Sequence, residues 1–288
     1  MADAVLPPVK PVLAPPRRRV RWRQHTNMLV GGGILVAILL ASIFADHLTP
    51  YGPLEQNLRN TLQPPSWAHP FGTDNFGRDI FTRVLHAAKL DLMICFLCVF
   101  FPWVLGTALG AVAGYFGGLV ETIVMRIVDT FSAFPFLVMA IGIIAILGPG
   151  ITSMYIALTL AGWSMYARIV RAEVLVVRQS EYVLAARALG YGHVRIMFGH
   201  ILPNVITPTI IFAMTDIVLV ILSTVSLSFL GLGVQPPTAE WGIILNEAKG
   251  FLLIAWWMVT LPGIVIVIVG LALSLFGDGV AQWLRERA

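Results

Sequence analysis

Apolar residues in this chain gather into long uncharged runs that short polar segments separate. The runs cover residues 28–45, 92–120, 130–167, 217–239 and 250–277. A helix needs about 20 apolar residues to cross the hydrocarbon core of a bilayer, and each run is long enough to do so. The pattern therefore predicts an all-α protein that crosses a membrane several times.

The run from Thr130 to Ala167 is too long for one crossing. Its 38 residues would reach about 57 Å as a single helix, nearly twice the hydrocarbon thickness. Gly148, Pro149 and Gly150 lie inside it, and a proline between glycines ends a helix and forms a turn. The hairpin gives six predicted spans, at residues 28–46, 90–115, 119–147, 152–174, 204–229 and 256–278.

Composition and charge support a membrane protein and orient it. Hydrophobic residues make up 58% of the chain and charged residues 12%, against about 25% charged in soluble domains. With the N-terminus in the cytoplasm, fourteen of the 19 lysines and arginines fall on the cytoplasmic side, as the positive-inside rule requires. Both termini are then cytoplasmic, and the net charge of +4 reflects membrane orientation rather than nucleic-acid binding.

This orientation divides the chain into segments. Residues 1–27 are rich in proline and then arginine, which predicts a disordered basic cytoplasmic tail that ends beside the lipid headgroups. A cleaved signal peptide is disfavoured because the tail ahead of the apolar run is long. The membrane domain covers 28–280, with external segments at 46–89 and 230–255, a cytoplasmic loop at 178–203 and a cytoplasmic C-terminus at 281–288.

Several local patterns carry structural expectations. Gly106, Gly110, Gly114 and Gly118 recur every four residues, which predicts one helix face for close packing. In the first external segment, Asp79 or Asp74 is expected to cap an amphipathic helix on the outer membrane surface. Trp241, Trp256 and Trp257 are expected at the membrane interface.

No metal, redox or catalytic site emerges from the motifs. Cys95 and Cys98 lie in an apolar span without a second pair, so they are expected to be core thiols, and the six histidines are dispersed. The chain has no phosphate-binding glycine loop, nucleophile elbow or zinc-protease motif. We therefore expect no enzyme and no cofactor in this chain, and any ATP and Mg²⁺ would be bound by partner subunits.

Asp216 interrupts the apolar pattern of the fifth predicted span. It lies twelve residues after Asn204, which places it about 18 Å into the membrane, near the midplane. A carboxylate there is costly and normally faces a bundle interior or a water-filled cavity. Its role in a translocation pathway and a structural hydrogen-bonding role remain equally open, and protonated burial without a function is the third alternative.

The cytoplasmic loop carries the stretch EYVLAARALGYGHVRIMFGHILPN, residues 181–204. Good helix formers fill 181–189, Gly190 and Gly192 break that helix, and Val194, Met197 and Phe198 form an apolar face on a second short helix before Pro203. Small Ala185 and Ala186 would allow another protein to approach closely. From the residues alone, a docking surface and an ordinary amphipathic loop are equally favoured.

A family resemblance distinguishes these two readings. The stretch resembles the signature loop of binding-protein-dependent ABC importer permeases, and FGTDNFGRD, RIVDTFSAFP, HILPN, SLSFLGLGVQPPTAEWG and LFGDG together resemble its dipeptide, oligopeptide and nickel group. These motifs extend from about residue 69 to 280. One departure is Leu184, which stands where the family usually has a glutamate, although Glu181 lies three residues earlier and faces nearly the same way.

The resemblance implies an inner-membrane, multi-pass permease subunit with the ABC importer permease fold, which forms half of a pathway for peptides. It implies a second related permease, two cytoplasmic ATPases and an external binding protein as partners, with lipid around the spans. The residues it assigns to ATPase coupling are Glu181, Ala185, Ala186, Arg187, Gly190, Arg195, Leu202 and Pro203.

Two other functions remain as alternatives. Within the family, the solute could instead be nickel or another small molecule. Outside it, a stand-alone secondary transporter would need its own coupling-ion site and an inverted repeat, whereas the sequence offers only Asp216 and no convincing repeat.

Overall fold

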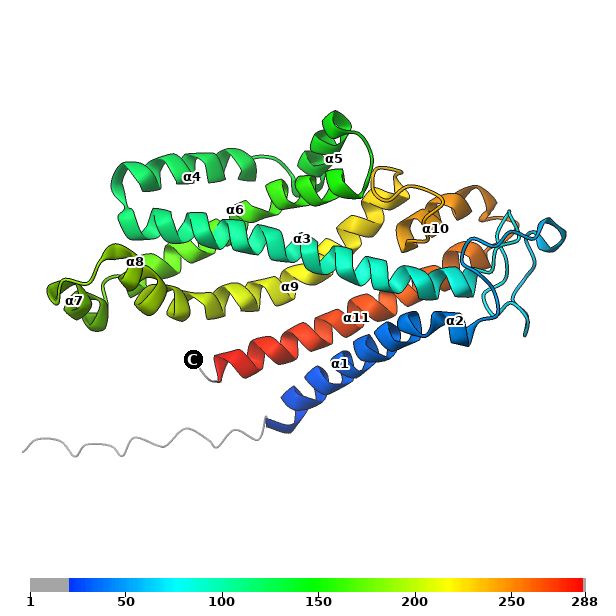
Figure 1. Cartoon of the computed structure of the whole chain (residues 1–288), viewed down its shortest axis with the longest axis horizontal. Helices are drawn as coiled ribbons and strands as arrows, with labels where there is room; N and C mark the ends of the chain where they lie inside the picture. Colours follow the sequence, from blue (N-terminus) through cyan, green and yellow to red (C-terminus); the bar gives the residue numbers. More distant parts are fainter. Residues whose placement is uncertain (1–20, 287–288) are drawn as a thin grey trace, which may run out of the picture.

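The computed structural model describes residues 21–286, which form an elongated helical bundle (Figure 1). Within these residues there is no β-strand, and the predicted all-α class is confirmed. The helices are α1 Arg21–Ile43, α2 Ala45–Leu48, η1 Leu58–Asn60, α3 Ile80–Phe116, α4 Gly118–Ser132, α5 Phe136–Leu147, α6 Ile151–Val177, α7 Glu181–Ala188, α8 His193–Ile196, η2 Met197–Ile201, α9 Leu202–Phe229, α10 Trp241–Ala248, η3 Lys249–Phe251 and α11 Trp257–Arg285.

The N-terminal end of the chain differs in part from the expected segment. The predicted tail of residues 1–27 lies largely outside the described residues, and from Arg21 onward it is already helical. The predicted C-terminal segment of 281–288 is helical as far as Arg285. Helix α1 extends ahead of its apolar run because each further residue adds a backbone hydrogen bond to a helix that is already nucleated.

Four helical segments among the described residues are long and apolar enough to cross a membrane: Thr26–Ile43 of α1, α3, His193–Phe229 and α11. The predicted single span at 119–147 is wrong as a straight helix. It consists of α4 and α5, which together are apolar enough but bend by 91° at the break between them. Pro135 lies in that break, and proline removes a backbone donor and keeps the preceding residue out of the helical region.

The predicted glycine face packs α3 closely along α6. A Cβ atom on Gly106 would lie 2.4 Å from the carbonyl oxygen of Trp163, and one on Gly110 would lie 2.4 Å from that of Ala167. On Gly114 the nearest atom would be the Cβ of Val174, at 2.8 Å. Gly118 does not share this role, because it has a φ of +54° in the turn that leads into α4.

Helices α1 and α11 also touch through glycines. A Cβ on Gly31 would lie 2.6 Å from the carbonyl oxygen of Ala272, and one on Gly279 would lie 2.5 Å from the Cβ of Met28. These contacts make the two helices antiparallel, so α1 begins and α11 ends at the same end of the bundle. Figure 1 shows the pair side by side, blue beside red.

The expected surface helix before the second span is wrong. Asp79 does cap a helix, since its Oδ2 accepts hydrogen bonds from the backbone N–H and the hydroxyl of Thr82, both at 2.7 Å. That helix is α3 itself, which continues without a break from Ile80 to Phe116. Residues 80–89 therefore extend the span beyond its apolar core instead of lying across the membrane surface.

A buried ionic cluster joins the segment before α3 to α10. Arg78 and Arg83 both contact Asp74, at 2.6 and 2.9 Å, and both contact Glu247 of α10, at 2.8 and 2.7 Å. Trp241 begins α10 and is fully buried, where its indole N–H donates to the carbonyl oxygen of Val84 at 3.1 Å. Trp241 is therefore a packing residue of this end and does not face outward as a residue of an aromatic belt would.

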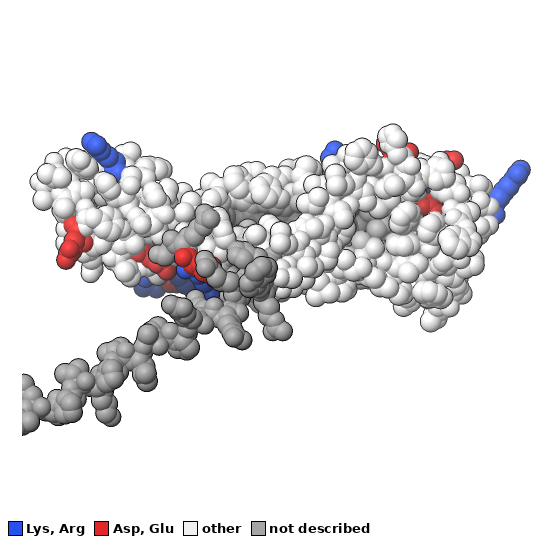
Figure 2. All heavy atoms as spheres, turned by 90° about the horizontal axis from the view of Figure 1, so that it is seen from below, with Lys and Arg blue, Asp and Glu red and all other residues white. Residues whose placement is uncertain are grey.

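Charged side chains gather toward the two ends of the bundle on the face in Figure 2. Helices α7 and α8 form one end, and α10 with the segment 49–79 forms the other (Figure 1).

Candidate coupling surface and membrane cavity

The polar insert folds as the predicted helix, break and helix. α7 ends at Ala188, and Gly190 follows with a φ of +78°. The N–H of Gly190 donates to the carbonyl of Arg187 at 2.9 Å, and the N–H of Tyr191 donates to that of Ala186 at 3.1 Å. This pair of bonds is the Schellman motif, whose left-handed position favours glycine. The break at Gly190 is confirmed with its physical cause.

The chain then re-enters the bundle without a second turn. α8 begins after Gly192 and continues through a π-helical turn, η2, into α9. Pro203 occupies the first turn of α9, directly after the π-helical turn. Residues 181–203 therefore project from one end of the bundle while remaining joined to the long helices α6 and α9.

Ala186 corrects the expectation that both alanines of the loop contact another protein. Its side chain is only 4% exposed and packs in a cluster of this chain with Val183, Ile196 and Val174. Leu202 packs against the same cluster. Because these side chains are enclosed by their own chain, they hold the loop in shape, whereas Ala185 one residue earlier is exposed.

The outer side of the loop is apolar. Leu184, Leu189, Val194 and Phe198 are 51–73% exposed, and we call these four residues the coupling face. Glu181, Arg187 and Arg195 are exposed beside them, and Pro203 is exposed at the start of α9. An apolar patch rimmed by charges, at the polar end of a membrane protein, is typical of a protein contact. Leu184, which departs from the family pattern, is thus part of this patch.

Aromatic and basic side chains connect the loop to α3. The hydroxyl of Tyr115 lies 2.9 Å from Nδ1 of His193. The guanidinium of Arg187 lies over the Tyr115 ring at 5.3 Å, and that of Arg195 over the ring of Tyr191 at 4.1 Å. The sequence did not reveal Tyr115 and His193 as a pair, because 78 positions separate them.

Asp216 borders a cavity that opens at the surface of the bundle. It stands near the middle of the 28-residue helix α9, and its Oδ2 accepts a hydrogen bond of 2.8 Å from the Tyr166 hydroxyl of α6. The cavity has a volume of about 540 Å³, and it is lined from the α4–α5 junction, α6 and α9. Its polar lining consists of Asp216 with the serines Ser132, Ser164 and Ser223. The structure thus combines a structural hydrogen bond with access to a cavity.

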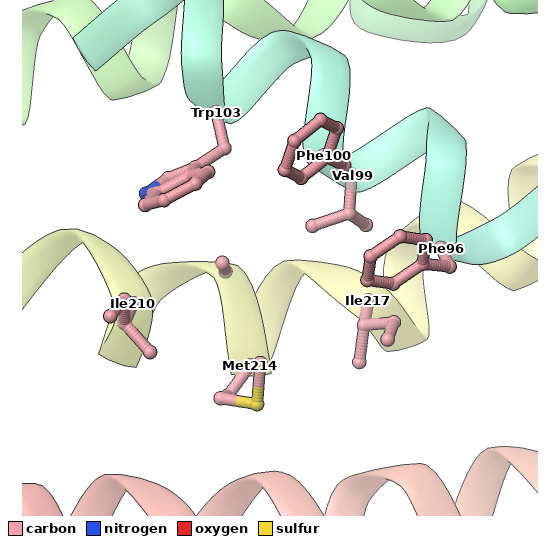
Figure 3. Close-up of a pocket in the computed structure, with 8 residues that line it drawn as sticks. Phe96, Val99, Phe100, Trp103, Ile210, Met214 and Ile217 are labelled. Atoms are coloured by element: carbon pink, nitrogen blue, oxygen red, sulfur yellow. The ribbon is translucent and has the colours of Figure 1, made fainter.

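A second, smaller hollow lies on another face of α9 and has an entirely apolar lining (Figure 3). Phe96, Phe100 and Trp103 extend into it from α3, opposite Ile210 and Ile217 of α9. At 100° per residue, these α9 positions are turned far from Asp216. Helix α9 therefore separates an apolar hollow from a cavity that carries a carboxyl group.

No group of three or more potential metal ligands occurs among the described residues. Cys95 and Cys98 are free thiols, each 1% exposed in the core, and their expected packing role is confirmed.

Comparisons with known proteins identify the same motifs. Residues 106–288 match the family model described as the inner membrane component of binding-protein-dependent transport systems. Residues 17–65 match the N-terminal transmembrane domain of oligopeptide transport permease C. Both terminal regions of the chain thus match the same class of permease.

Individual relatives agree with these matches. The chain is 42% identical to the dipeptide transport system permease protein DppC of Alkalihalophilus pseudofirmus, over 92% of this chain and 90% of that protein. It is also 42% identical to DppC of Escherichia coli K12, over 92% and 91%. A solved structure of the MetNI methionine ABC transporter in an inward-facing conformation matches 70% of this chain and 96% of its own with a TM-score of 0.56. At 19% identity, that match supports the fold alone.

Proposed function

Because this chain belongs to the family of inner membrane components of binding-protein-dependent transport systems, we propose that it forms half of a peptide pathway driven by ATP. It is a multi-pass permease of the inner membrane. Its curated relatives are named as dipeptide permeases, and they support small peptides as the solute. Nickel or another small solute is the alternative within the family, and no group of metal ligands among the described residues favours it.

The coupling face is the observation that supports an ATP-driven mechanism. Four exposed apolar side chains on the loop offer a contact for a soluble protein, and buried Ala186 with partly buried Leu202 holds that loop against the long helices. Glu181, Ala185, Arg187 and Arg195 supply the polar rim. A motion of a bound ATPase would thereby reach α6 and α9, between which Asp216 and Tyr166 form their hydrogen bond.

The proposed membrane topology has six crossings. They are α1, α3, the bent pair α4 and α5, α6, α9 and α11. Helix α6 has 27 residues and is long enough, although Arg168, Arg171 and Glu173 make its second half more polar. The cations of α6 are paired, Arg171 with Glu121 and Arg168 with Asp129 at 3.2 Å. The shared end of α1 and α11 is the cytoplasmic one, since Arg285 lines a hollow with Asn204 beside the coupling loop.

The proposed complex contains partners that supply what this chain lacks. A second related permease completes the pathway, two ATPase subunits bind ATP and Mg²⁺, and an external binding protein delivers the solute. A stand-alone secondary transporter is disfavoured, because the coupling face would then be an apolar surface exposed to water without a partner.

A pair of matched leucines tests this function. Leu189 of the coupling face and Leu58 of the external segment are 73% and 72% exposed. Leu189→Glu places a charge in the proposed contact, and loss of an interface contact of this kind commonly costs about 2 kcal/mol, or about thirtyfold in affinity. We expect it to lose the co-purified ATPase and uptake of a labelled dipeptide.

Leu58→Glu is the control, and it should keep the ATPase at the parental ratio. Retention of the ATPase by both variants would refute the coupling face. A parental complex that assembles but imports nickel and no dipeptide would replace the proposed solute.

A further inference from the structure

The two oxygens of the Asp216 carboxyl group have different surroundings. Oδ2 accepts the hydrogen bond of Tyr166, and Phe212 packs edge-on against the Tyr166 ring at 5.0 Å between centroids. Within residues 21–286, no hydrogen bond to Oδ1 and no salt bridge to Asp216 occurs. One oxygen thus holds the group in place, while the other has no protein partner in the described chain.

The lining of the surrounding cavity determines which kind of chemical group could bind beside Asp216. Apart from Asp216, its lining consists of hydroxyls and apolar side chains, among them Phe131, Phe136 and Phe212. Ser132 already accepts a hydrogen bond from Arg168 at 3.2 Å, and Ser223 donates to the carbonyl of its own helix at 2.7 Å. The carboxyl is therefore the one ionisable group in the lining, and the volume of about 540 Å³ falls in the range of small-molecule sites.

We propose that Asp216 is a recognition site in the pathway for a primary ammonium group of the passing solute. A held carboxylate with a free oxygen binds a hydrogen-bond donor with a positive charge, and charge-assisted bonds are about twice as strong as neutral ones. Aromatic rings nearby favour the same cation through their faces. The inference rests on the proposed function, since small peptides carry such a group at the amino terminus and, in lysine peptides, also on the side chain.

The charge of the cavity is measured independently of transport by labelling a cysteine inside it. Leu219 lines the same cavity three residues from Asp216 and is 62% exposed, and Leu219→Cys supplies the thiol in the purified complex. The probes are two methanethiosulfonate reagents that have the same reactive group and opposite charges, one with a trimethylammonium group and one with a sulfonate group. Native Cys95 and Cys98, each 1% exposed, contribute little background.

We expect the cation to react faster than the anion, and Asp216→Asn to lower that ratio about tenfold, the change that about 1.4 kcal/mol produces. Asp216→Glu should restore the preference, since it returns the charge. Thr61→Cys, exposed in the external segment, is the control whose ratio should be unaffected by Asp216→Asn. A ratio at Leu219→Cys that Asp216→Asn leaves unchanged would overturn the proposal.

Uptake of two peptides then distinguishes the sources of the ammonium group. If Asp216 receives the amino terminus, Asp216→Asn should lower kcat/KM for alanyl-alanine and lysyl-alanine by the same factor, about tenfold. If it receives the lysine side chain, only lysyl-alanine should be affected. Equal uptake by parent and variant of both peptides would refute the recognition role. A parental complex that imports neither peptide would instead refute peptide transport, while the labelling ratio still decides the charge of the cavity.

Discussion

Helix α3 can approach α6 closely because residue 110 is a glycine, which has no side chain. Gly110→Val would place a Cβ 2.4 Å from the carbonyl oxygen of Ala167 and 2.9 Å from the Cβ of Val170. Ordinary contact begins at 3.4 Å, so the helices must separate locally by about 1 Å. The contacted oxygen belongs to the backbone of α6, and a backbone atom cannot rotate away as the end of a side chain can.

The cost of this overpacking is about 1–3 kcal/mol. Valine regains less than about 0.5 kcal/mol from its better helix propensity, so a net loss of about 2 kcal/mol is expected. At about 2–4 °C for each kcal/mol, the unfolding midpoint should fall by about 4–8 °C. The measurement is the thermal midpoint of the purified complex, followed by size-exclusion chromatography after heating.

Gly270→Val is the matched control, because no atom lies within 4 Å of a Cβ built on Gly270 of α11. Its midpoint should remain within about 1 °C of the parent. Equal midpoints for the two variants would refute the argument that α3 and α6 pack through this glycine.

Two further predictions concern the loop and the topology. Gly190→Val should release the ATPase or uncouple hydrolysis from uptake, because valine in a left-handed conformation costs about 1–2 kcal/mol. Gly192→Val is the control and should do neither, because Gly192 has an ordinary φ of −68°. Equal ATPase binding by both variants would contradict the role of the turn. Cysteines at Thr61 and Gln235 should react with an impermeant thiol reagent added outside sealed cells, and a cysteine at Gln179 should not; labelling at Gln179 would reverse the orientation.

Local signals in the sequence sufficed for the parts of the fold that neighbouring residues decide. Gly148 and Gly150 mark the end of α5 and the start of α6, and Gly190 marks the end of α7, because glycine conformations and proline rings act on their own backbone. The same holds for Asp79, whose side chain caps the helix that begins at the next residue.

Positions that depend on distant partners were not readable in the same way. The residues Arg83 and Glu247 are 164 positions apart and meet within a buried cluster, and Tyr115 meets His193 across 78 positions. Ala186 looks like an open contact in the sequence, yet it is enclosed by helices from three parts of its own chain. Which small residue faces inward is a consequence of how the helices cross, and a local pattern contains no information about that crossing.

The sequence by itself determined that the chain consists of apolar helices long enough to cross a membrane, with a polar loop broken by glycine, since apolar runs and turn residues act over a few positions. Only the tertiary structure decided that α4 and α5 meet at 91° and that Asp216 both accepts the Tyr166 hydroxyl and borders a cavity. A midplane carboxyl group costs free energy wherever it lies. Whether a hydrogen-bond partner, a cavity or both offset that cost depends on the side chains that neighbouring helices bring beside it.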